Sequence, residues 1–351
     1  MTDPVASHAG GAGGKSRQRR LWPAVAALAL ALAALAIFLL RPVQDGPAAD
    51  EGRTLVVGDQ RGGAQALLRA AGELDGVPYR IKWALFPAAS PLLEALDAGA
   101  IDIGGIGGAP FAFAYASGAH IKAVTAYRPA GVHAGKASAI VVPKNSPIRT
   151  LADLRGKQVA TIRGSVGQDL VLRLLERAGI DPKSIRWTYL SNGESKAALA
   201  SGAIDAWSTW GSYVGIAVLE DGDRILADGG DLPSGVGFYA ANDKAVEQKR
   251  ALLGDYIARL ARARAWARDH LDDYARVLAK ETGIPLDVAR FAAQSYVGAA
   301  VPIDEALVRE QSRIFQRYHA AGIIPDIPQA DKGYDGSFNQ HVTAALRRPG
   351  A

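Results

Sequence analysis

Three predicted helices begin at turns rich in small residues, and each turn follows a predicted strand. The turns are Arg61-Gly62-Gly63-Ala64, Gly107-Gly108-Ala109-Pro110 and Gly164-Ser165-Val166-Gly167. A helix N-terminus exposes N–H groups without helical partners and carries about half a positive charge, so it attracts anions. Ligands of open α/β sheets bind at the carboxyl ends of strands. Each turn alone is typical of an ordinary connection, but the three together predict a site for a small anion.

Two tryptophans, Trp207 and Trp210, stand where a predicted strand of the second half of the chain, residues 204–207, ends. A pair at this spacing is typical either of a core or of an aromatic wall beside a ligand, and both interpretations stay open. The chain offers little for catalysis: it has no nucleophile elbow, and Ser165 has no evident base. The three turns also lack the glycine spacings of phosphate loops and dinucleotide-binding motifs.

Composition excludes several classes of site. The chain has no cysteine, which excludes disulfides, thiolate metal sites and a cysteine nucleophile. Its six histidines form no H-x-x-x-H or H-E-x-x-H pair, so we expect neither a metal nor a cofactor. The net charge is +5, but six basic and four acidic residues lie in the first 53 positions, which leaves an excess of +3. That excess does not predict nucleic-acid binding.

An uncharged apolar run covers residues 21–40, and four basic residues precede it within a Gly-rich tail, residues 1–20. The run is long enough to cross a bilayer as a helix, since about 20 residues suffice. The basic residues predict a cytoplasmic N-terminus and export of the rest of the chain. An uncleaved transmembrane anchor is favoured over a cleaved signal, which stays open, as does the export route (Sec or Tat). Residues 41–53 read as a linker.

An internal repeat indicates two similar lobes. The segment Ala95–Asp102, ALDAGAID, returns as Ala198–Asp205, ALASGAID. Each copy reads as a helix end, a glycine suited to positive φ and a strand that starts at Ile-Asp. Two such units predict two α/β lobes that face each other across a cleft.

Strands and helices alternate from Thr54 onward, which predicts a mostly parallel sheet in each lobe. The pattern restarts after Pro143, and the segment from Asp243 to the end reads as helical. The chain would therefore cross between lobes near residues 140 and 235, and two crossings make a hinge. Lobe 1 is predicted to comprise residues 54–140 and 235–351, and lobe 2 residues 141–234.

The motifs resemble a known family. Gly104–Pro110, Gly164-Ser165, Ile204–Trp210 and Thr150–Lys157 are similar to segments of the substrate-binding proteins of ABC importers for aliphatic sulfonates, taurine and nitrate, most of all to the sulfonate branch. The similarity covers roughly residues 54–330. It implies a type II periplasmic-binding-protein fold. It also implies a monomer that lies in the periplasm or on the outer face of the cytoplasmic membrane. Such a protein delivers a small organic anion to a membrane permease.

The resemblance also implies which residues contact the ligand. Gln60-Arg61 stands where the family often has Gln-Lys, Gln168 stands where many members have His, and Trp207 and Trp210 match. The full set of predicted ligand-binding residues is Gln60, Arg61, Gly62, Gly108, Ala109, Ser165, Val166, Gln168, Trp207 and Trp210.

Two acidic positions of the family are lost. Gly108 stands where the family often has Asp, and Gly211-Ser212 replaces the usual Asp-Pro. A less negative cleft favours a simple sulfonate over the amino-bearing taurine, although the exact ligand stays open. Two other functions also stay open: an enzyme on the same fold, similar to a thiamine-pyrimidine synthase, and a membrane-tethered ligand sensor.

Overall fold

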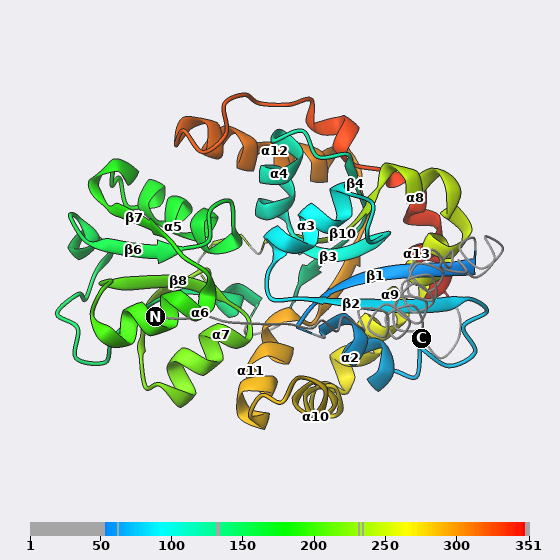
Figure 1. The fold of residues 1–351 in the computed structure, drawn as a ribbon, viewed down its shortest axis with the longest axis horizontal. Helices are drawn as coiled ribbons and strands as arrows, with labels where there is room; N and C mark the ends of the chain where they lie inside the picture. The colour runs from blue at the N-terminus through cyan, green and yellow to red at the C-terminus, as the bar shows by residue number, and fades with distance from the viewer. Residues whose placement is uncertain (1–52, 62, 131–133, 231, 234, 348–351) are drawn as a thin grey trace, which may run out of the picture. The chain divides into compact units, whose positions relative to one another are not determined.

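Two β-sheets organise the chain in the computed structural model, which describes residues 53–347 apart from 62, 131–133, 231 and 234 (Figure 1). The first sheet has the order β11-β4-β10-β3-β1-β2 and the second β7-β6-β8-β5-β9. All strands of a sheet run in one direction except β10 and β11 in the first and β5 in the second. The expected mostly parallel sheets are thus confirmed. The strands are β1 Thr54–Gln60, β2 Arg80–Phe86, β3 Ile103–Gly107, β4 Ile121–Pro129, β5 Ser138–Val142, β6 Gln158–Thr161, β7 Arg186–Tyr189, β8 Ala206–Trp210, β9 Arg224–Asp228, β10 Gly237–Asn242 and β11 Gly298–Val301.

Helices follow most strands. They are α2 Gly63–Ala70, α3 Ala89–Asp97, α4 Gly108–Ala116, α5 Val166–Arg177, α6 Asn192–Ser201, α7 Ser212–Gly215, α8 Asp243–Gln248, α9 Arg250–Asp269, α10 Leu271–Thr282, α11 Leu286–Tyr296, α12 Glu305–Ala320 and α13 Asn339–Leu346. None of the helices in the described part combines the length and apolarity needed to cross a membrane. The predicted anchor, residues 21–40, lies outside the described residues.

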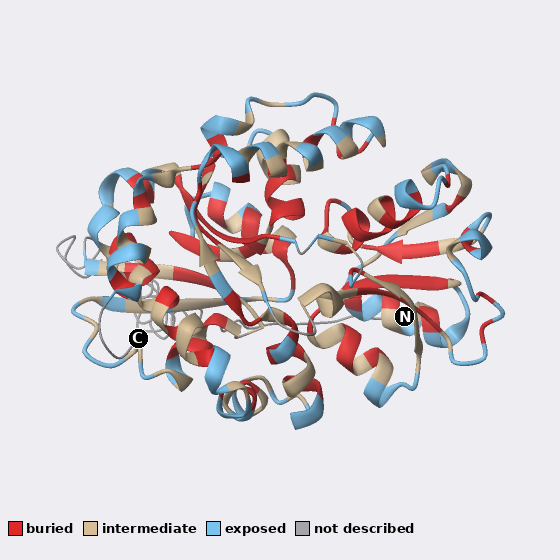
Figure 2. Cartoon of the chain, turned by 180° about the vertical axis from the view of Figure 1, so that it is seen from behind, coloured by how far each residue is buried: buried red, intermediate tan, exposed pale blue. Residues whose placement is uncertain are grey.

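Alternating strand residues supply two cores for each sheet, because successive side chains point to opposite faces. In β1, Leu55 and Val57 join the core with α2, α9 and α10, whereas Val56 joins the core with α3. In β5, Ile140 packs toward α5 and Val141 toward α6 and α7. Figure 2 shows the resulting run of buried residues along the strands.

The repeat forms the same local structure twice. Gly99 and Gly202 have φ of 71° and 76° and end α3 and α6. Asp102 accepts a hydrogen bond from the Val56 N–H of β1 at 2.7 Å, and Asp205 accepts one from the Gln158 N–H of β6 at 2.8 Å. Each aspartate therefore ties the exit of a helix to the neighbouring strand. The strands begin just after Ile-Asp, at Ile103 and Ala206, rather than at the isoleucines.

We call the first sheet with its helices lobe 1 and the second sheet with its helices lobe 2. The strand β5 already begins at Ser138 in lobe 2, slightly ahead of the predicted boundary at residue 141. Within the C-terminal segment predicted to be helical, β11 is a strand that pairs antiparallel with β4. A free edge of β4 accounts for this difference, since strand pairing satisfies its backbone groups.

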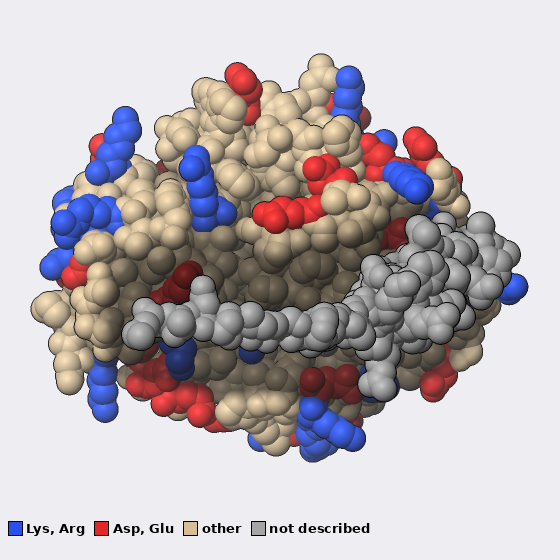
Figure 3. Space-filling view, viewed as in Figure 1, with Lys and Arg blue, Asp and Glu red and all other residues tan. Residues whose placement is uncertain are grey.

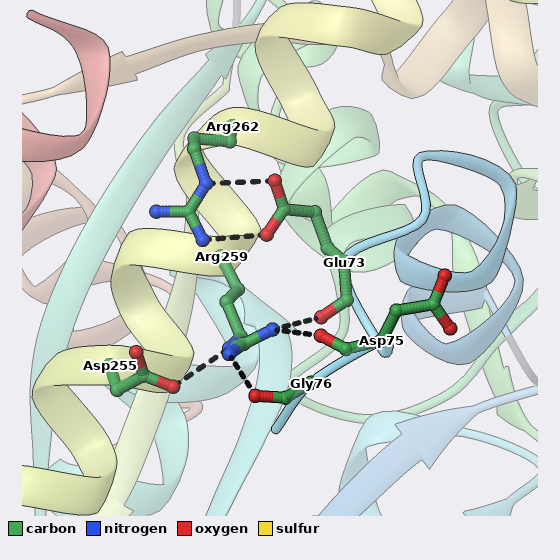
Figure 4. A network of polar contacts seen from close by, with 6 residues as sticks. All are labelled: Glu73, Asp75, Gly76, Asp255, Arg259 and Arg262. Atoms are coloured by element: carbon green, nitrogen blue, oxygen red, sulfur yellow. Dashed lines mark hydrogen bonds and ion pairs between the residues drawn. The ribbon is translucent and has the colours of Figure 1, made fainter. Parts of the chain in front are cut away.

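The long helix α9 of lobe 1 is held by a half-buried ion pair and by hydrogen bonds to backbone carbonyls. Arg262 of α9 binds both carboxylate oxygens of Glu73, at 2.8 and 2.6 Å, and Arg259 donates to the carbonyl oxygens of Glu73, Asp75 and Gly76 (Figure 4). These bonds fix α9 against the loop after α2, so the side chains that α9 presents to the interior are held in place.

A candidate anion-binding cleft

A cleft of about 590 Å³ lies between the lobes. Lobe 1 contributes the turn after β1 and the start of α4, and lobe 2 contributes the start of α5 and the end of β8. Seven of the predicted ligand-binding residues line it: Gln60, Arg61, Gly108, Ala109, Ser165, Val166 and Trp210. Gly62 lies outside the described residues. The fold therefore brings most of the predicted set to one place.

Trp207 and Gln168 do not line the cleft. Trp207 is fully buried and packs edge-on against Tyr213, with ring centroids 6.1 Å apart, in the core of lobe 2. Gln168 accepts a hydrogen bond from the Gly164 N–H at 2.7 Å and donates to the Tyr189 hydroxyl at 3.0 Å. These contacts correct the expectation from sequence: Trp207 fills the core, and Gln168 holds the turn before α5.

The start of α2 already holds a carboxylate of the chain itself. The two oxygens of Asp59 accept the N–H groups of Ala64 and Gln65 at 3.0 and 2.9 Å. Asp59 is 3% exposed, and its burial raises the pKa of the carboxyl to about 6 although the N–H bonds act to lower it. Of the three predicted anion-binding turns, this one is therefore occupied.

The starts of α4 and α5 keep N–H donors that have no acceptor among the described residues. At α4 the Gly108 N–H donates to the Val236 carbonyl oxygen at 2.9 Å and Pro110 has no N–H, which leaves that of Ala109. At α5 the Gln168 N–H is capped by the Ser165 hydroxyl at 3.2 Å, which leaves those of Val166 and Gly167. N–H groups of the first helical turn have no helical acceptor.

These two helix starts lie against each other. A Cβ atom on Gly107, the N-cap of α4, would collide with the side chain of Val166 in α5. The glycine thus permits close approach of the two N-termini across the cleft. Two positive helix ends that converge favour an anion between them.

Gln311 of α12 is a cleft residue that the sequence did not point to. It is 2% exposed and lines the cleft, and its Oε1 atom has no hydrogen-bond partner in the described part of the chain. A Cβ on Gly108 would collide with that atom. The sequence signal was a polar residue between Leu307 and Phe315 on the buried side of α12.

Arg61 connects the lobes across the cleft. It has a positive φ of 54°, a conformation that costs a non-glycine residue about 1 kcal/mol and that persists where the surroundings hold it. Its Nη1 atom donates to the Tyr213 hydroxyl at 2.7 Å, and its guanidinium carbon lies 4.6 Å from the ring centre. The strained backbone of lobe 1 thus aims a cation at lobe 2.

Charge in the cleft favours an anion. Among the described lining residues, six are arginines and four are acidic: Arg61, Arg173, Arg177, Arg264, Arg313, Arg317, Asp59, Asp169, Glu176 and Glu310. On the outer face drawn in Figure 3, by contrast, basic and acidic side chains are interspersed. The lining of the cleft therefore carries more positive than negative side chains.

Comparisons with known proteins agree with this geometry. Residues 86–272 match the family model described as NMT1/THI5 like. An aliphatic sulfonates-binding protein of Escherichia coli (strain K12) is 37% identical over 67% of this chain and 73% of its own length. The crystal structure of the periplasmic aliphatic sulphonate binding protein SsuA from Escherichia coli has a TM-score of 0.70 at 32% identity, covering 80% of this chain and 91% of that one. The alkanesulfonate-binding protein SsuA from Xanthomonas axonopodis pv. citri, bound to MOPS, has a TM-score of 0.73 at 29% identity, covering 81% and 98%.

Proposed function

Because the chain belongs to the NMT1/THI5-like family and is related to the periplasmic sulfonate-binding components of ABC importers, we propose that it is the solute-binding protein of such an importer. It captures a small organic anion, an aliphatic or aryl sulfonate, in the cleft between its lobes. It then presents the anion to a membrane permease. The close relatives are binding proteins rather than enzymes.

The observation that carries this proposal is the convergence of two helix N-termini with unused N–H groups. Ala109 supplies one donor from lobe 1, and Val166 and Gly167 supply two from lobe 2. A sulfonate has three oxygens that accept hydrogen bonds and one negative charge, so it matches these donors in number and sign. The start of α2 gives an example within this chain, since its N–H groups donate to the carboxylate oxygens of Asp59.

Contacts from both lobes couple ligand binding to closure of the cleft. Arg61 of lobe 1 donates to Tyr213 of lobe 2, and Tyr318 of α12 donates to the Ser165 carbonyl oxygen at 3.0 Å. A ligand held by both helix starts adds further contacts that exist only when the lobes are together. Such differential contact shifts a hinged protein toward its closed state.

The polar groups of the cleft suit binding better than catalysis. The Ser165 hydroxyl lies 3.1 Å from the Thr161 hydroxyl and accepts the Gln168 N–H, so its neighbours in the described chain are not a general base. A serine nucleophile requires a base within hydrogen-bond reach. We therefore propose capture without chemical change of the ligand.

The site of action is proposed from the N-terminal segment and the relatives. The apolar run at residues 21–40 would hold the protein at the outer face of the cytoplasmic membrane, or be cleaved to release it into the periplasm. Protease added to spheroplasts should therefore digest the region beyond residue 53. Full protection of that region would contradict export and with it the role in an importer.

Calorimetry with the full chain tests the ligand class. We expect 1-butanesulfonate to bind and 1-butanol, which shares the apolar tail, to show no binding. At a concentration of about 100 Kd the sulfonate should raise the free energy of unfolding by about 2.7 kcal/mol. Equal binding of the two compounds would mean that the cleft recognises the tail and not the anion.

A further inference from the structure

Arg264 of α9 is a cation on the lobe 1 side of the cleft that the site described above does not use. Its side chain is half-buried and lines the cleft, and its guanidinium carbon lies 3.3 Å from the centre of the Tyr127 ring. Its Nη1 atom donates to the carbonyl oxygen of Tyr296 at 3.4 Å. Tyr239 and Tyr274 line the same part of the cleft. The surroundings are therefore aromatic, and the acceptors that they offer, among them the Tyr239 hydroxyl, are uncharged.

No carboxylate forms an ion pair with Arg264 in the part of the chain that the structure describes. Its Nε atom is buried without a hydrogen-bond partner. Asp59 lines this part of the cleft too, but both its oxygens accept N–H groups from the start of α2. Charges withdrawn from water are normally paired, because an isolated one costs several kcal/mol. A pairing anion would therefore have to enter through the cleft.

The sheet register places Arg264 relative to the two helix starts. Gly237 of β10 pairs with Gly107 of β3 on one side and with Tyr127 of β4 on the other. Two strand spacings, about 10 Å, separate the Cα atoms of Tyr127 and Gly107, and the Tyr127 ring leans over Gly237 of the strand between them. Gly107 is the N-cap of α4, and Arg264 stacks on the Tyr127 ring. Since each hydrogen bond takes up about 3 Å, a ligand that reaches both ends needs two acidic groups held apart by a short spacer.

We propose that the ligand carries a second anionic group, a carboxylate, opposite its sulfonate, and that Arg264 binds this carboxylate. The chemical class is a sulfocarboxylate whose spacer is a benzene ring or a short carbon chain. The tyrosines beside Arg264 favour the ring, because aromatic faces pack on one another. This inference rests on the proposed function, since it assumes that the sulfonate occupies the starts of α4 and α5.

Two ligands of matched shape test the inference in the unaltered full chain. The probes are 4-sulfobenzoate and 4-toluenesulfonate, which differ by a carboxylate in place of a methyl group. Calorimetry should give 4-sulfobenzoate an affinity about tenfold higher or more, as expected for charged hydrogen bonds. Equal affinities, or tighter binding of 4-toluenesulfonate, would overturn the inference and leave the proposed function intact. If neither compound binds while 1-butanesulfonate does, the inference is overturned and the proposed function stands.

Variants separate binding from a structural role. Arg264→Gln should remove the preference for 4-sulfobenzoate and leave the affinity for 4-toluenesulfonate nearly unchanged, and Arg264→Lys should restore part of the preference. Arg268→Gln is the control and should change neither affinity, because Arg268 is an exposed cation of the same helix α9 that does not line the cleft. A structural Arg264 would lower the melting temperature and leave the ratio of the two affinities unchanged, which would overturn the inference. Where Arg264→Gln does not fold, Arg264→Lys and the wild-type comparison decide.

Discussion

The hydroxyl of Ser165 allows a sharp prediction, because its proton can be traced. Its Oγ atom accepts the Gln168 N–H at 3.2 Å and lies 3.1 Å from the Thr161 Oγ1 atom. Thr161 donates its own proton to the carbonyl oxygen of Ser208 at 3.0 Å. The proton between the two hydroxyls therefore comes from Ser165, which makes this residue a helix cap with no proton left for a ligand.

Replacing Ser165 with alanine removes the cap of α5. We expect the free energy of unfolding to fall by about 1 kcal/mol, the usual value for such a cap. A hydroxyl that donates to a sulfonate oxygen would contribute about 1.5–3 kcal/mol, or roughly 10-fold to 100-fold in affinity. Because the proton is held by Thr161, we expect the affinity to fall by less than about tenfold, through a less ordered helix start.

Urea unfolding and calorimetry with 1-butanesulfonate measure the two effects separately. Ser191→Ala is the matched control, since Ser191 caps α6 of the same lobe by accepting the Glu194 N–H at 3.3 Å and does not line the cleft. Both variants should lose similar stability, and the control should keep its affinity. A loss of affinity well above tenfold in Ser165→Ala, with little change in stability, would refute this account of the proton.

Three further predictions concern pH, ligand choice and the N-terminal segment. The pKa of Asp59 is raised from 3.8 to about 6 in the folded chain, so the folded state holds this proton more tightly than the unfolded one. The free energy of unfolding should therefore fall by about 3 kcal/mol as the pH rises from below 4 to above 6. Asp59→Asn should remove this pH dependence in urea unfolding measured across that range. If the variant keeps the pH dependence, other groups cause it. Gly108→Asp should weaken the binding of 1-butanesulfonate through charge repulsion. Because a Cβ atom at this position already collides with Gln311, Gly108→Ala is the control that measures the effect of crowding alone. Tighter binding of taurine than of 1-butanesulfonate by the wild type would contradict the argument from missing acids. A chain truncated to residues 54–351 should fold, and it should bind 1-butanesulfonate with the same affinity as a chain that lacks only residues 21–40. An insoluble product would show that the folded region begins earlier.

Local sequence determined much of this protein, wherever the controlling interactions lie within a few residues. The repeated ALxxGAID segment predicted the left-handed glycines at Gly99 and Gly202, because glycine adopts positive φ without a steric penalty. The alternation of strands and helices predicted two mostly parallel sheets. Small residues predicted the starts of α4 and α5, which the fold brings to the cleft.

Only the tertiary structure decided which of these residues line the cleft. Trp207 and Trp210 lie on one strand and look alike in sequence, yet one is in the core and the other lines the cleft. All three helix starts are rich in small residues. Asp59 nevertheless fills one of them, and its bonds depend on how the turn after β1 folds. Gln311 and Arg264 come from helices far along the chain, and the packing of α12 and α9 brings them to the cleft. Such contacts between distant segments leave little trace in local sequence, because they depend on how whole elements pack.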